Sequence, residues 1–206
     1  AREYAHSVVG IKVRIGRYAS GNAGLIPLQI AREVAEELKL PLLTPVDFPP
    51  PDRDDVLNIL RPGDILTHCF RPFPNAPVDG QGSIRESVRK ARERGVYFDL
   101  GHGAGSLSFK VSRQMLEQIF LPDTISSYVH QFSINGPAFD NLVTMSKFLG
   151  LGMPLDQVIC ASTATPAKAI GRTDLGTLEV GAQGDAVVLN IEDGEFEYHD
   201  VTGDTF

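Results

Sequence analysis

Five short apolar segments recur along the chain at similar intervals, and this spacing constrains the fold more than any other feature. Their starts lie about 23–33 residues apart, which is the length of one strand–helix unit. Short apolar strands separated by helices are typical of a buried parallel sheet with right-handed crossovers. The spacing therefore predicts an α/β protein with about five βα units, whose strands span residues 8–15, 41–46, 64–69, 96–101 and 123–128.

Helical patterns fill the intervals between these strands. The clearest is a stripe of apolar residues over 25–38, with Pro27 in its first turn, where proline is favoured. A shorter helix is predicted to begin near Asp52, and further helices are predicted at 84–94, 109–119, 139–149 and 155–170. The pattern changes from Thr177 onward, where three short β-like runs are joined by glycine turns. We therefore expect residues 1–172 to form the α/β body and residues 173–206 a small β appendage.

Composition excludes several classes of partner. The net charge is −7 at pH 7, and no run rich in Lys or Arg occurs, so we expect no nucleic-acid partner. No apolar stretch reaches the roughly 18 residues that a membrane span needs. Cys69 and Cys160 lie in apolar contexts far apart in the sequence, which predicts two buried, reduced thiols. These features favour a soluble, cytoplasmic protein.

Ionisable residues lie at the ends of the predicted strands. Lys12 lies within the first strand, His68 ends the third, and His102 closes the fourth. In β/α proteins the functional face is where the strands end, so these residues indicate a site built from several strands. Each has an alternative role. Lys12 could be a salt-bridged lysine, and the glycines around His102 could bind an anion or permit a tight turn. His130 could lie at the pocket rim or in a solvated loop.

Several segments spread over nearly the whole chain form a combined pattern. They are Gly10–Arg14, Leu40–Leu43, Phe48–Pro51, Arg61–Phe70, Phe98–Gly103 and Pro122–Ser127, followed by Ala161–Ala167, Gly176–Leu178 and Gly184–Leu189. Together these segments resemble the amidohydrolase superfamily, specifically its dihydroorotase and amino-acid deacetylase-like branch.

The resemblance implies a (β/α)₈ TIM-type barrel, here partial, in which residues 173–206 are a fragment of the superfamily's β-sandwich. It also implies a metal-dependent hydrolase of a C–N (amide or imide) or ester bond. One or two divalent metals would lie at the strand ends and activate a water molecule, and zinc is the metal that the resemblance favours. Lys12 would be the carboxylated lysine that bridges the metals, and His68 would be a histidine ligand. His102 and His130 would lie near the substrate.

The chain departs from this pattern at the metal site. Pro45 occupies the position of a histidine ligand, and Tyr128 occupies that of the aspartate that would serve as ligand and general base. Only Lys12 and His68 remain as metal ligands. The sequence therefore leaves open a second possibility, a degenerate barrel that binds a ligand or a partner subunit without turnover.

Five βα units also cannot close an eight-stranded barrel, because closure fixes strand number, tilt and stagger together. An open sheet exposes strand edges to pairing with other chains. We therefore expect a homo-oligomer, or a partner chain that completes the barrel.

Overall fold

The computed structural model describes residues 2–4 and 6–206. Its centre is a parallel sheet in which the strands follow one another in sequence order. The register aligns Lys12 with Leu43, Leu43 with Ile65, and Ile65 with Tyr97. The predicted parallel sheet is confirmed, although its strands are shorter than predicted: β1 Ile11–Lys12, β2 Leu42–Pro45, β3 Ile65–Thr67 and β4 Tyr97–Phe98.

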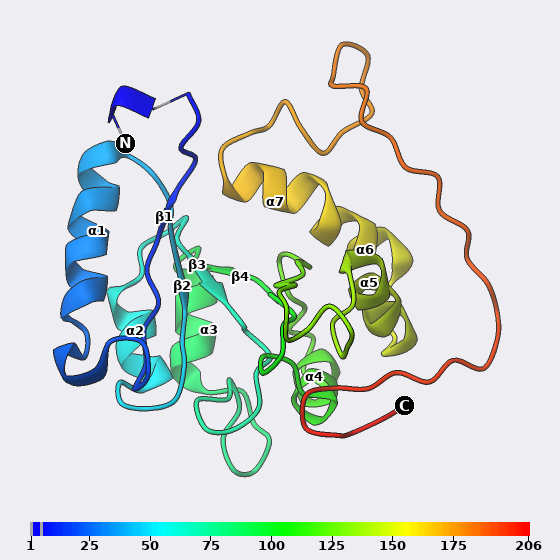
Figure 1. Cartoon of the computed structure of the whole chain (residues 1–206), viewed down its shortest axis with the longest axis horizontal. Helices are drawn as coiled ribbons and strands as arrows, with labels where there is room; N and C mark the ends of the chain where they lie inside the picture. The colour runs from blue at the N-terminus through cyan, green and yellow to red at the C-terminus, as the bar shows by residue number, and fades with distance from the viewer. Residues whose placement is uncertain (1, 5) are drawn as a thin grey trace.

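The helices flank this sheet. In Figure 1, α1 lies along one side and α5 to α7 along the other, with the strands between them. Apolar side chains from α1, α2 and α3, including Leu28, Leu57 and Val88, join those of the strands in one core. The helices are α1 Ile26–Leu38, α2 Arg53–Ile59, α3 Glu86–Glu93, α4 Phe109–Glu117, α5 Asn141–Gly150, α6 Leu155–Ser162 and α7 Ala164–Ala169, with the 3-10 turns η1 Arg2–Tyr4 and η2 Gly21–Ala23.

Local sequence explains where several helices begin. α1 has proline in its first turn. The side chains of Ser108 and Asp140 accept hydrogen bonds from the first turns of α4 and α5. The single helix predicted over 155–170 is wrong, because the chain divides at Thr163, whose hydroxyl donates to the carbonyl of Ile159 at 2.7 Å. Such a bond competes with the helical backbone pattern.

The fifth predicted strand, 123–128, continues the sheet without becoming a regular strand. Parallel bridges join Asp99 to Thr124 and His102 to Ser127. The interruption falls at Gly101, which has φ +55°. A Cβ atom there would collide with the Thr67 Oγ1, so the close approach requires glycine. The segment nevertheless brings the backbone of Tyr128 beside His102, since the Tyr128 N–H donates to the His102 carbonyl at 2.7 Å.

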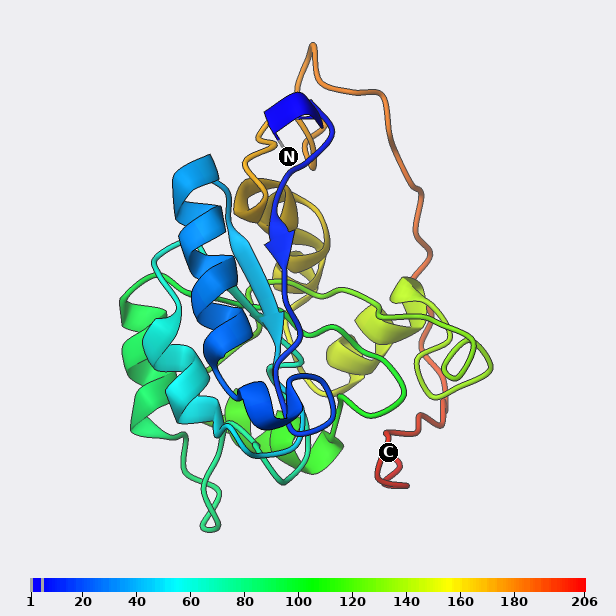
Figure 2. The same cartoon turned by 60° about the vertical axis from the view of Figure 1, so that its left-hand side comes forward.

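The three β-like runs predicted after Thr177 do not form regular strands in the structure, and the appendage as a unit stays a prediction. Within residues 173–206 the structure has no regular strand, and one antiparallel bridge joins His199 to Thr205. Val187 and Val188, in a run predicted as a strand, are 82% and 98% exposed because no neighbouring strand pairs with them. Figures 1 and 2 show this tail leaving α7 and running around the outside of the molecule to end near α4. The division at residue 172 itself stays a prediction.

Two further expectations have different outcomes. Cys69 is buried and free, as predicted, whereas Cys160 on α6 is free but exposed. The apolar context of Cys160 misled the prediction, because the neighbours that are buried, Val158 and Ala161, lie on another face of the helix. Among the described residues, no helix has the length and apolar character needed to cross a membrane.

Candidate functional site

A cavity of about 480 Å³ lies where the parallel strands end. It brings together three of the positions singled out in the sequence, Pro45, His68 and Tyr128, with His130 beside them. The rings of His68 and Tyr128 are 5.4 Å apart, and those of Tyr128 and His130 are 5.6 Å apart. The remaining lining residues are Arg14, Val46, Asp47, Phe48, Arg71, Gly103, Ala104, Gly105, Ser106 and Phe132.

Lys12 lies against this cavity but is exposed. Its Nζ lies 4.5 Å from the centroid of the Tyr128 ring, which is cation–π geometry. Alternation along the strand explains the placement, because Ile11 and Val13 pack against the core while Lys12 and Arg14 face the other side. The Lys12 side chain therefore faces away from the core. The ammonium remains accessible at the open face of the sheet.

His68 is held in a defined tautomer at the end of β3. Its backbone has φ +61°, an uncommon conformation for a residue other than glycine. Its Nδ1 lies 2.8 Å from the Gly101 carbonyl oxygen. Because a carbonyl can only accept, Nδ1 carries the proton and Nε2 is left as an acceptor. Burial lowers the pKa of His68 to about 3, and the positive charges of Arg71, Arg14 and Lys12 act in the same direction. The imidazole is therefore neutral at pH 7.

Asp99 anchors the strand ends, although it was not among the site residues inferred from the sequence. Its carboxylate accepts hydrogen bonds from the hydroxyls of Thr67 at 2.5 Å, Thr124 at 2.6 Å and Ser126 at 2.9 Å. Burial raises the pKa of Asp99, while these hydroxyls oppose that shift. The signal in the sequence that could have identified Asp99 is the set of polar residues in the neighbouring strand segments. Asp99 joins three segments of the sheet, and its oxygens are already occupied.

His102 is not among the residues that line the cavity, which differs from the substrate contact expected for it. Its side chain is fully buried, and its Nε2 lies 2.9 Å from the Nζ of Lys147 on α5. Lys147 also donates to the carbonyls of Pro137 and His199. Burial lowers the pKa of His102 to about 3 and that of Lys147 to about 8. Lys147 was not identified from the sequence. The one feature that pointed to its burial is its position beside the apolar Phe148.

The residues present do not fit a tightly held divalent metal. No group of three or more His, Cys, Asp or Glu side chains among the described residues could hold one. Lys12 and His68 supply two ligands at most, and the carboxylate of Asp99 is taken up by hydroxyl groups. A catalytic zinc normally has three protein ligands and an open position. The two remaining ligands therefore predict only weak metal binding.

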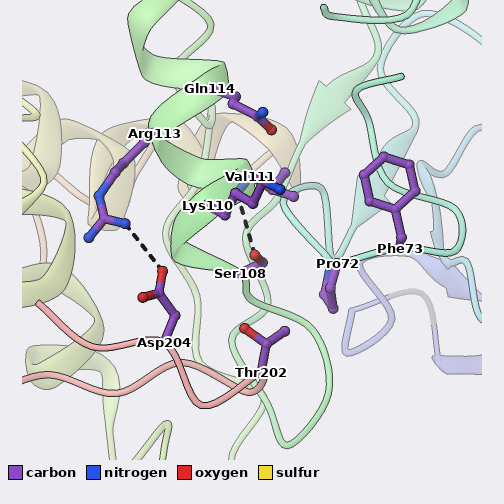
Figure 3. Close-up of a pocket in the computed structure, with 9 residues that line it drawn as sticks. All are labelled: Pro72, Phe73, Ser108, Lys110, Val111, Arg113, Gln114, Thr202 and Asp204. Carbon is purple, nitrogen blue, oxygen red and sulfur yellow. Dashed lines mark hydrogen bonds and ion pairs between the residues drawn. The ribbon is translucent and has the colours of Figure 1, made fainter. Parts of the chain in front are cut away.

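A second cavity, of about 680 Å³, lies between α4 and the C-terminal tail. Figure 3 shows Arg113 of α4 pointing toward Asp204 of the tail, and the two form an ion pair at 3.2 Å. Phe73 faces the cavity from the opposite side. None of the site residues expected from the sequence lines this cavity. The candidate site is therefore the one at the strand ends.

Comparisons with known proteins identify relatives of this chain. No family model matches the chain. The chain is 36% identical over 197 residues to a deacetylase of Brucella anthropi, covering 96% of this chain and 49% of the relative. It is 35% identical over 202 residues to a deacetylase of Agrobacterium fabrum, covering 98% and 50%. The chain thus spans about half the length of the curated relatives it matches.

Solved structures give the same result. A structure described as an adenine deaminase superposes on the whole chain with a TM-score of 0.96 and 33% identity, and the match covers 56% of that structure. A dihydroorotase superposes with a TM-score of 0.86 and 35% identity, covering 100% of this chain and 54% of the other.

Proposed function

The chain belongs to the amidohydrolase superfamily, whose TIM-barrel members it matches over about half of their length, and we propose that it functions as a hydrolase of a C–N or ester bond in a small molecule. The observation that carries this proposal is the pocket at the carboxyl ends of the strands. Pro45, His68 and Tyr128 come from three separate segments, yet they line one cavity. This end of the strands is where barrel enzymes of this type hold their substrates.

The superfamily resemblance implies a divalent metal, and we propose zinc, with Lys12 and His68 as the residues that would hold it. Lys12 would act in carboxylated form. Two ligands bind a metal less tightly than the three or four of ordinary zinc sites. We therefore expect activity only in the presence of excess added metal, and at a low rate.

A hydrolysis assay tests this proposal. The chain, stripped of metal and then given excess zinc, is incubated with N-acetyl amino acids and with acetyl esters of small hydroxy acids, and released acetate is measured. We expect slow, zinc-dependent turnover that the substitution His68→Asn abolishes. The matched control is His199→Asn, because the side chain of His199 is exposed and is not among the residues that line the cavity. An absence of zinc-dependent turnover with every one of these substrates would contradict the hydrolase proposal.

A second candidate function is binding without turnover. Tyr128 favours binding without turnover, because a phenol is a poor general base at neutral pH. Its ring also makes a cation–π contact with Lys12. In that case the pocket would bind small molecules saturably while releasing no product.

We also propose that a second copy or a partner chain covers the free edge of β1. This strand is at one end of the sheet order, so its outer edge has no neighbouring strand in the described chain. Sedimentation velocity should give a mass above that of one chain, and a monodisperse monomer would count against it. The two free thiols are compatible with the cytoplasmic location that we propose.

A further inference from the structure

Arg53, the first residue of α2, is a buried cation that the candidate site does not use. Its side chain is 1% exposed, and it takes part in no ion pair among residues 2–4 and 6–206. Its Nη1 has no hydrogen-bond partner in that part of the chain. Burying an unpaired guanidinium is costly, because the protein replaces only part of the water that is lost. A long apolar side chain would avoid this cost, so the donors of Arg53 require a reason.

The guanidinium of Arg53 joins the two ends of the loop that follows β3. Its Nη2 donates to the His68 carbonyl at 3.4 Å, and its Nε donates to the Asn75 carbonyl at 2.8 Å. Both of these residues have positive φ, +61° for His68 and +66° for Asn75, a conformation that is uncommon outside glycine. One planar group thus holds both ends of the loop in a backbone conformation that such residues rarely adopt.

Asn75 extends the connection to a second loop, the one that follows β2. Its Oδ1 accepts from the Arg53 N–H at 2.9 Å, while its Nδ2 donates to the carbonyls of Asp47 at 2.8 Å and Pro51 at 3.2 Å. Asp47 and His68 line the strand-end cavity. Arg53 and Asn75 instead line a separate cavity of about 210 Å³. The pair therefore contacts the backbone of two pocket residues from outside the pocket.

We propose that Arg53 is a positioning residue for the strand-end pocket, and that it acts through Asn75 and the backbone of His68. The donors of the guanidinium fix the start of the loop at His68, and this in turn keeps the imidazole Nδ1 at 2.8 Å from the Gly101 carbonyl oxygen. The inference rests on the proposed function only in that His68 would act in that pocket. Without these donors the segment at His68 should relax, and the imidazole should lose its fixed tautomer.

The imidazole tautomer of His68 reports this role directly, because a loss of overall stability does not by itself change the tautomer in folded molecules. The metal-free chain carries isotope-labelled histidine, and NMR identifies the His68 ring nitrogens by comparison with His68→Asn. In the unmodified chain we expect the Nδ1-protonated form that the Gly101 contact requires. Arg53→Met retains a long side chain without donors. We expect it to raise the share of the Nε2-protonated form, with a change of about tenfold in the tautomer ratio.

A conservative variant and a control separate positioning from packing. Arg53→Lys restores one donor, so its tautomer ratio should lie between those of the unmodified chain and Arg53→Met. Arg94→Met is the matched control, because Arg94 also donates to a backbone carbonyl, that of Leu57 on α2, at 2.8 Å. Neither Arg94 nor Leu57 lines the strand-end cavity. We therefore expect the His68 tautomer to be unchanged in this control.

Asn75→Gly keeps the test decisive if Arg53→Met does not fold. Glycine readily adopts the positive φ of this position, but it has no amide group to reach the carbonyls of Asp47 and Pro51. We expect a shift of the His68 tautomer ratio in the same direction as in Arg53→Met, by about three- to tenfold.

The outcomes are distinct. A shifted tautomer ratio in Arg53→Met or Asn75→Gly, smaller in Arg53→Lys and absent in Arg94→Met, supports the positioning role. An unchanged ratio in the folded variants would overturn it, because Arg53 would then only fill space. An equal shift in Arg94→Met, or an Nε2-protonated His68 in the unmodified chain, would overturn it as well. Because no metal or turnover is involved, failure of the hydrolysis assay leaves this result unaffected.

Discussion

Replacement of Lys147 by alanine is expected to lower the free energy of unfolding by about 4 kcal/mol. The Lys147 side chain is 1% exposed and donates to the carbonyls of Pro137 and His199 and to the imidazole of His102. Its loss leaves buried acceptors unpaired, at about 1–3 kcal/mol each, and opens a cavity between α5 and the tail. Urea denaturation followed by circular dichroism measures the change.

Two control variants identify the cause. Lys168→Ala removes an exposed lysine from α7 and should change the stability by less than about 0.5 kcal/mol. Lys147→Met retains most of the volume but none of the donors, so it separates the cavity from the lost hydrogen bonds. If Lys147→Ala were as stable as Lys168→Ala, the buried lysine would not connect these segments in solution.

The double substitution Pro45→His and Tyr128→Asp is expected to raise the affinity for zinc by about 100-fold or more, or roughly 2.7 kcal/mol. It increases the local ligand count from two to four by restoring an imidazole and a carboxylate beside Lys12 and His68. The positions are suitable, because Pro45 and Tyr128 line the same cavity as His68 and the Lys12 Nζ lies 4.5 Å from the Tyr128 ring. The change Tyr128→Asp would also remove the ring that now stacks against Lys12.

The matched control places the new carboxylate elsewhere on the same wall. Phe132 lines the cavity and is 74% exposed, so Pro45→His with Phe132→Asp adds the same groups without completing the site. Calorimetric zinc titration should show a large gain in the first variant and little in the control. Equal affinities in both would mean that the strand ends do not converge on one metal position.

The body of the fold could be predicted because strand–helix spacing is a local property of the sequence. Apolar runs at intervals of one βα unit predicted the parallel sheet, and Pro27 predicted the start of α1. The tail could not be predicted in the same way. Val187 and Val188 have the composition of a strand, but strand formation depends on a pairing partner, and these residues have none in the described chain.

The part of the candidate site that lies at the strand ends could be predicted from the sequence. Lys12, His68 and Tyr128 meet because parallel strands end at one edge of the sheet. His102 shows the limit of that rule. It ends a strand segment as expected, but its side chain bonds to Lys147, which is 45 residues away in sequence and whose partnership depends on tertiary packing. Arg14 and Arg71 likewise meet only because the fold brings them to the same cavity.

The central claim is that this amidohydrolase-type pocket lacks the ligands that would hold a divalent cation tightly. The most direct test is calorimetric titration of the unmodified, metal-free chain with zinc at neutral pH. The cationic lining and the two remaining ligands predict weak binding, with a Kd above about 10 µM, or roughly −7 kcal/mol. One or more equivalents of zinc bound with a submicromolar Kd would contradict it.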